Sequence, residues 1–215
     1  MSYSGPFPFF DGHNDVLLRL YRKQVDNVET LFIEGETVGQ LDLPRAQIGG
    51  FGGGFFAIFS PSDEREDIDS EMDGDAYDIA LPKVLPHHLA LEATLSMAAI
   101  LFRIERASAG KFKVCRTAAD IRRCLKSNTI AAVFHIEGAE AIDGDLNSLE
   151  VLYESGLRSL GPVWSRPNIY AHGVPFRYPS TPDTGPGLTD LGKALLKACN
   201  SMAFLPTSLP AAKLN

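Results

Sequence analysis

A histidine and two aspartates follow an apolar run near the start of the chain. The run, residues 7–10, predicts a short buried strand, and Asp11-Gly12-His13-Asn14-Asp15 comes directly after it. If the strand continues, His13 and Asp15 point to the same side, because side chains alternate along a strand. An imidazole and a carboxylate that converge there suit a divalent metal ion, zinc above all. The pattern alone also allows a strand-capping histidine with an aspartate in a turn.

A third candidate ligand follows another apolar run. Residues 130–136 are apolar up to His135, which is typical of a strand buried on both faces of a parallel sheet. Functional groups gather at the carboxyl ends of such strands, so we expect Glu137 to lie beside His13 and Asp15. A shared carboxylate can bridge two metal ions that activate water, so hydrolysis is the expected reaction and Glu137 the candidate catalytic residue.

Other polar residues allow a functional and a structural interpretation. His172 and Asn168 lie in the proline-rich loop 165–186, which could reach a substrate, and Trp164 could wall a pocket or simply pack. We expect His135 to face away from Glu137 as a structural histidine. The remaining expectations concern two loops: a tight turn at the glycine-rich stretch 49–54, rather than a phosphate cradle, and a solvated loop over the acidic residues 62–78.

Composition narrows the class of protein. The chain has 215 residues, a formal net charge of -7 and 45% hydrophobic residues, which is ordinary for a globular protein. No basic stripe is present to bind nucleic acid. Three cysteines without a C-x-x-C spacing argue against a disulfide framework and favour a reducing compartment. Without a signal-peptide pattern or a long apolar stretch, we expect a cytoplasmic protein with no membrane anchor.

Strands and helices are expected to alternate. The order β, β, α, β, α, β, α, with a further short helix before the third strand, predicts an α/β fold with a parallel sheet. We expect strands at 7–10, 55–59, 130–136 and 157–164. Helices are expected at 87–108, 118–126 with Thr117 as the N-cap, 146–153 and 188–199.

Six stretches, taken together and in this order, resemble the membrane (renal-type) dipeptidase family, and its bacterial members in particular. They cover most of residues 9 to 200: Phe10–Asp15, Leu41–Arg45, Gly52–Phe59, His135–Asp143, Gly156–Gly161 and Asp183–Thr189.

The resemblance implies a TIM-like (β/α)8 barrel with a binuclear zinc site that hydrolyses dipeptides. It implies that His13 and Asp15 are zinc ligands and that Glu137 is the bridging carboxylate. The implied partner is a dipeptide substrate, and a homodimer is a further expectation.

The chain departs from the family pattern towards its end. No histidine follows His172, so the histidines that the family uses for its second zinc have no counterpart, and Trp164 stands where the family has a histidine. We interpret residues 1–201 as the N-terminal part of a dipeptidase barrel and residues 202–215 as an aberrant tail after a truncation. We therefore expect at most one weakly bound zinc ion and impaired activity. The alternatives are a non-catalytic remnant and another metal-dependent amidohydrolase acting on an amide or lactone.

Overall fold

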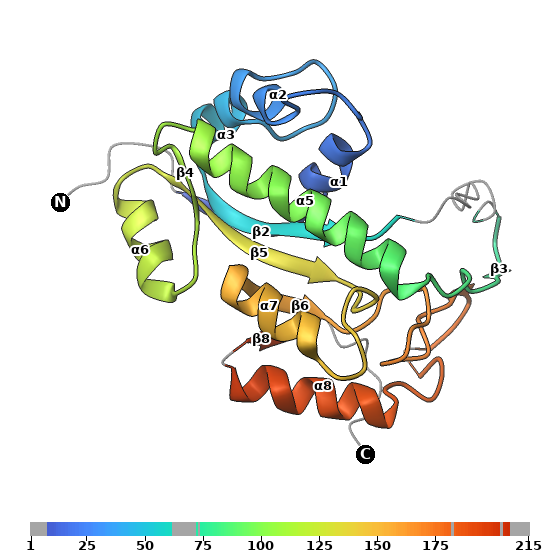
Figure 1. The fold of residues 1–215 in the computed structure, drawn as a ribbon. Coiled ribbons are helices and arrows are strands. Elements are labelled where there is room, and N and C mark those ends of the chain that lie inside the picture. Colours follow the sequence, from blue (N-terminus) through green and yellow to red (C-terminus); the bar gives the residue numbers. More distant parts are fainter. Residues whose placement is uncertain (1–7, 62–71, 73, 182, 203, 207–215) are drawn as a thin grey trace. The chain divides into compact units, whose positions relative to one another are not determined.

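The structure is a computed structural model that describes residues 8–61, 72, 74–181, 183–202 and 204–206 (Figure 1). Its strands are β1 (Phe9–Asn14), β2 (Phe51–Phe59), β3 (Tyr77–Ile79), β4 (Phe112–Val114), β5 (Ile130–Glu137), β6 (Leu157–Gly161), β7 (Phe176–Tyr178) and β8 (Leu205–Pro206). Its helices are α1 (Val16–Tyr21), α2 (Glu29–Glu34), α3 (Leu43–Gly49), α5 (His87–Ala107), α6 (Ala118–Lys126), α7 (Asn147–Ser155) and α8 (Asp190–Ser201).

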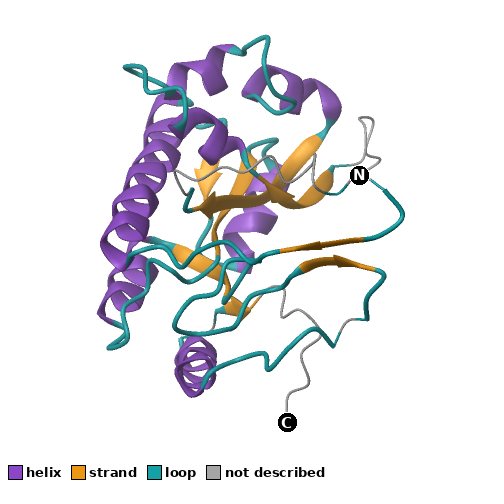
Figure 2. Ribbon diagram, turned by 90° about the vertical axis from the view of Figure 1, so that its right-hand side faces the viewer, coloured by secondary structure: helices purple, strands orange, loops and turns teal. Residues whose placement is uncertain are grey.

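The main sheet confirms the α/β prediction. Its strand order is β1-β2-β5-β6-β8, and β4 pairs with β5 outside this path. The pairs β1–β2, β4–β5 and β6–β8 are all parallel. The short strands β3 and β7 form a separate antiparallel pair; Figure 2 distinguishes the strands, helices and loops by colour. In the part of the chain that the structure describes, no helix is both long and apolar enough to cross a membrane.

The chain divides into two compact units. The first contains Met1–Phe59, Thr94–His135 and Glu154–Arg158, and the second contains the segments Ser60–Ala93, Ile136–Tyr153 and Ser159–Asn215. Each unit is therefore assembled from three separate stretches of sequence, and the boundary passes through strand β5.

Aromatic packing holds the core of the first unit together. The rings of Phe32 in α2, Phe56 in β2 and Phe112 in β4 meet edge to face, with centroids 5.0–6.3 Å apart. All three side chains are buried, and each such ring pair contributes about 0.5–1.5 kcal/mol beyond its buried area. The core thus links elements that are far apart in the sequence.

The glycine-rich stretch is a strand, so our prediction of a tight turn at 49–54 is wrong for most of its length. Only Gly50, in the left-handed conformation at the end of α3, makes a turn, and β2 begins at the next residue. A Cβ atom on Gly53 would lie 2.3 Å from the carbonyl oxygen of Ala131 in β5. The glycine therefore allows a close approach of two neighbouring backbones.

Helix α6 lies where the sequence predicts it. Thr117 accepts a hydrogen bond from the Asp120 backbone N–H, and the Asp120 carboxylate accepts one from the Thr117 N–H. This capping box satisfies amide groups that the first turn would otherwise leave unbonded.

Short-range hydrogen bonds also order the second unit. The carboxylate of Asp143 accepts hydrogen bonds from the backbone N–H and the hydroxyl of Ser148, at 2.7 and 2.6 Å, and so fixes the start of α7. The Tyr170 hydroxyl donates to the Asp143 carbonyl at 2.6 Å. Thr189 is the N-cap of α8, so the helix begins at Asp190, two residues later than the sequence predicts.

Other boundaries differ from the predictions. Strand β1 begins two residues later and runs through the polar motif, and β6 ends at Gly161 rather than at Trp164. The acidic stretch lies mostly outside the described residues, but its end, from Tyr77, forms β3. The sequence did not predict α2, α3, β3, β4, β7 and β8, which are two to seven residues long.

Candidate metal centre

The end of β1 is irregular where the polar motif begins. Asp11 pairs with Gly54 of β2 and Asn14 pairs with Phe56, so three steps along β1 correspond to two along β2. Such a bulge redirects side chains and is common beside functional sites. Here it falls at Gly12 and His13.

Hydrogen bonds within the motif fix this irregular segment. One oxygen of Asp11 accepts from the His13 backbone N–H at 3.3 Å, and the other accepts from the Asn14 amide at 3.0 Å. The same Asn14 amide donates to the Phe55 carbonyl at 3.1 Å. Asp11 and Asn14 therefore position the residues on either side of them.

His13 and Asp15 point toward each other. The distance from His13 Nε2 to Asp15 Oδ1 is 3.4 Å, and the two side chains are 38% and 56% exposed. Strand alternation is not the reason, because β1 ends at Asn14 and Asp15 already occupies the N-cap position of α1. The two donors are close, as the spacing predicts, but a change of backbone conformation between them brings them together.

Glu137 is the last residue of β5 and is half-buried. One donor atom from each of His13, Asp15 and Glu137 lies within 4.8 Å of the other two. One nitrogen and two carboxylate oxygens are a set that zinc accepts, and carboxylates also suit harder divalent ions. The donor chemistry thus fits a divalent metal ion, and the assignment of these residues as ligands stays a prediction.

His135 faces this motif, so our expectation of its orientation is wrong. Its ring lies edge to face with His13 and with Phe55, with centroids 6.0 Å apart in both pairs, and it is 4% exposed. Side chains alternate along a strand, so residues two positions apart project to the same side of the sheet, and His135 and Glu137 do so. The two-residue spacing between His135 and Glu137 was the sequence signal that could have predicted this orientation.

A second acidic residue follows β5 and is buried. Glu140 forms an ion pair with Arg166 at 3.5 Å, and Arg166 also donates to the Ser60 carbonyl at 2.8 Å. Burial raises the pKa of Glu140 to about 7, against the opposing effect of Arg166. Sequence analysis did not single out this pair; an arginine and a glutamate that follow successive buried strands were its only signal.

The three candidate substrate residues lie in the second unit. The Trp164 ring packs against Phe176 with centroids 5.6 Å apart. The Asn168 side chain donates to the Pro162 carbonyl and accepts from the backbone N–H groups of Tyr170 and Ala171, so it holds the loop. His172 is exposed. Their role toward a substrate stays a prediction.

Comparison with known families identifies the type of protein that this chain is similar to. A sequence model described as membrane dipeptidase, peptidase family M19, matches residues 4–205. A curated relative, an uncharacterized protein from the PQQ-III 3′ region of Acinetobacter calcoaceticus, is 39% identical over 195 residues, which are 89% of this chain and 60% of the relative.

Two solved structures are similar in both sequence and fold. A metallopeptidase from Rhodobacter sphaeroides, liganded with a phosphinate mimic of the dipeptide L-Ala-D-Ala, is 48% identical with a TM-score of 0.89. The match covers 93% of this chain and 57% of that one. A second metallopeptidase, dipeptidase AC, is 46% identical with a TM-score of 0.90, over 96% of this chain and 59% of that one. The predicted fold class, part of a TIM-like barrel, is confirmed, and the chain spans about three fifths of the length of these relatives.

Proposed function

Because the chain belongs to the membrane dipeptidase family, we propose that it forms part of a metal-dependent dipeptidase that hydrolyses the peptide bond of a dipeptide. The observation that carries this proposal is the grouping of His13, Asp15 and Glu137 within 4.8 Å. The match to metallopeptidases over more than nine tenths of the chain supports it.

We assign the metal-holding role to His13, Asp15 and Glu137. A divalent ion bound there would polarise the substrate carbonyl and lower the pKa of a bound water. Asp11 and Asn14 serve this role indirectly, because their hydrogen bonds fix the backbone on both sides of His13. Zinc is the ion we propose, as the usual partner of a histidine with carboxylates.

Glu137 has a second proposed role, as the group that accepts a proton from the attacking water. It is half-buried at a strand end, which restricts its side chain more than a loop would. A carboxylate in this role commonly contributes about 10²–10⁴-fold to the rate. His172, exposed in the loop after β6, is the candidate contact for the substrate, with Asn168 holding the loop and Trp164 beside it.

The described donors suffice for one ion rather than two. Among the described residues, His13, Asp15 and Glu137 are the one group of three or more potential ligands with this spacing. We therefore propose that the chain by itself binds at most one zinc ion, weakly, and hydrolyses dipeptides slowly.

Metal content and activity together test the proposal. The zinc-loaded chain is dialysed, its metal is measured, and it is assayed with L-Ala-D-Ala, the dipeptide whose mimic is bound in the Rhodobacter sphaeroides neighbour. His13→Ala should abolish metal retention and lower activity by more than about 100-fold, beyond the loss typical of an outer-shell partner. His88→Ala is the matched control, since His88 is exposed on α5 outside the cluster, and it should change neither.

Three results would overturn parts of this assignment. Two zinc ions retained per chain would contradict a single weak site. Equal metal binding by His13→Ala and the parent chain would remove the proposed ligand set. Turnover of lactones with no turnover of dipeptides would favour the other amidohydrolase activity.

A further inference from the structure

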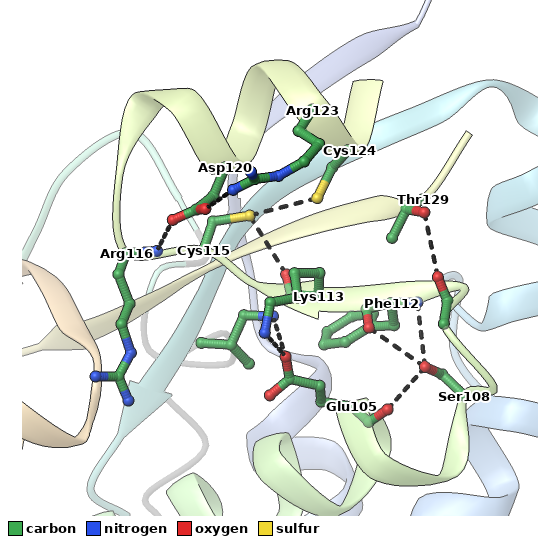
Figure 3. Close-up of polar contacts among 12 residues, drawn as sticks. Glu105, Ser108, Phe112, Lys113, Cys115, Arg116, Asp120, Arg123, Cys124 and Thr129 are labelled. Atoms are coloured by element: carbon green, nitrogen blue, oxygen red, sulfur yellow. Dashed lines mark hydrogen bonds and ion pairs between the residues drawn. The ribbon is translucent and has the colours of Figure 1, made fainter. Parts of the chain in front are cut away.

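Two buried thiols face each other in the first unit, away from the candidate metal ligands in sequence. Cys115 follows β4 and Cys124 lies in α6, and their Sγ atoms are 3.7 Å apart (Figure 3). The two residues are only 2% and 5% exposed, and neither takes part in the proposed hydrolysis. The third cysteine, Cys199, lies in α8 of the second unit.

The backbone holds both thiols in place. The Cys115 N–H donates to the Ala132 carbonyl at 2.8 Å, which extends the β4–β5 pairing by one residue. Cys124 is carried by α6, whose first turn is fixed by the capping box at Thr117 and Asp120. The sulfur atoms therefore meet because two well-ordered elements bring them together.

A cavity leads to one of the two thiols. Its volume is about 370 Å³, within the range of pockets that hold small molecules. Cys124 lines it, together with Phe112, the hydroxyl residues Ser127 and Thr129, and charged residues of both signs: Glu105, Lys113, Asp120 and Arg123. Cys115 is not among the lining residues, so a small reagent meets Cys124 first.

We propose that Cys115 and Cys124 form a reversible dithiol–disulfide pair, which low-molecular-weight disulfides oxidise through the cavity at Cys124. A disulfide needs the two sulfur atoms about 2.05 Å apart, so they must approach by less than 2 Å from their present separation of 3.7 Å. Side-chain rotation on both residues can provide this movement.

The reaction balances in two exchange steps. The Cys124 thiolate attacks one sulfur of the reagent, forms a mixed disulfide and releases the other half as a thiolate, which takes up a proton. The Cys115 thiol then loses its proton and attacks Cys124 Sγ, which releases the second half as a thiol. One small disulfide is reduced to two thiols while the protein dithiol loses two hydrogens.

The electrostatics agree with this order of attack. Burial raises the pKa of the Cys115 thiol, and negative charge on Cys124 raises it further. The raised pKa makes Cys115 a poor first nucleophile, and Cys124, which lines the cavity, is the thiol that attacks first. The product ties α6 to the end of β4 through a loop of about ten residues, which restrains the helix without a new contact elsewhere.

The parent chain gives the primary test. After treatment with hydroxyethyl disulfide under native conditions, two of the three thiols should disappear, with a mass loss of two hydrogens and no bound adduct. Peptide mapping should join Cys115 to Cys124, and dithiothreitol should restore both thiols. Cys199→Ser, the in-chain control, should behave in the same way. Three free thiols after this treatment, or a link that involves Cys199, would overturn the proposal.

Single variants test the order of attack. Cys115→Ser should trap one hydroxyethylthio group on Cys124, because the resolving thiol is missing. Cys124→Ser should leave Cys115 unmodified on the same timescale. Equal modification of both variants would overturn the role of the cavity. Cys115→Ala and Cys124→Ala repeat the comparison without a buried hydroxyl, and circular dichroism establishes that each variant is folded.

Discussion

Asp15 and Asp143 both lie just before a helix, yet their carboxylates are used differently. The oxygens of Asp143 accept from Ser148 and from the backbone N–H groups of Asp145 and Asn147. This bonding holds the pKa of Asp143 well below its usual range. Asp15 is 56% exposed, and its described contact is with the ring of His13. The Asp143 carboxylate is occupied by hydrogen bonds that hold the turn, whereas the exposed Asp15 carboxylate is available to a ligand.

The difference separates structural from functional acidic residues. A carboxylate that accepts several short hydrogen bonds stabilises its turn, and an added cation would have to compete with them. A carboxylate with free lone pairs beside an imidazole costs the fold little and can coordinate a metal. Position before a helix does not distinguish the two; their partners do.

The largest expected effect is on metal affinity. Asp15→Ala should weaken zinc binding by more than about 100-fold, because it removes a proposed ligand, and should change the free energy of unfolding by less than about 0.5 kcal/mol. Asp143→Ala should leave zinc affinity unchanged. Competition with a chromogenic chelator measures the zinc affinity of each variant. Equal affinities for the two variants would contradict the proposed difference between Asp15 and Asp143.

The next largest effect is on stability. Asp143→Ala should lower the free energy of unfolding by about 2 kcal/mol, because it leaves several amide groups before α7 without acceptors. Since the pKa of Asp143 is lowered in the folded chain, its contribution is full above pH about 4 and is lost as the pH falls below that value. Urea unfolding at neutral and acidic pH should show the variant and parent converging in acid. Asp145→Ala, exposed in the same turn, is the control and should have little effect at either pH.

The smallest effect concerns the cap of α6. Thr117→Ala should cost about 1 kcal/mol, since it removes the acceptor for the Asp120 N–H, and Thr117→Ser should restore most of it. Thermal unfolding of the three proteins measures the difference. A loss in the serine variant as large as in the alanine variant would point to the lost methyl group rather than to the cap.

The parts of the fold that the sequence predicts have strong local signals. Helix α6 has a capping residue, an acidic first turn and basic residues in its last turn, and its bounds agree with the prediction. The strand β5 is an almost continuous apolar run, so its position and the half-buried end that carries Glu137 could be predicted directly from the sequence. His13 and Asp15 were singled out because a histidine and a carboxylate two residues apart, directly after an apolar run, can both ligate a metal ion.

The missed parts depend on contacts that are distant in the sequence. β3 and β7 are three residues long, and their pairing joins residues about a hundred positions apart. The glycines of β2 gave a turn signal, but the close approach of the Ala131 carbonyl is what requires Gly53. The buried pair of Glu140 and Arg166 likewise forms only once the chain has folded. No short window of sequence contains these partners.

The discontinuous first unit has a consequence for protein synthesis. Its last segment, Glu154–Arg158, is translated long after Met1–Phe59, and the whole of Ser60–Ala93 emerges between them. Buried residues of β2 such as Phe56 and Ile58 are therefore synthesised before the later segments of the unit against which they pack. During that interval the nascent chain exposes an apolar strand, so its yield in the cell should depend on chaperones that bind such segments before translation reaches residue 158.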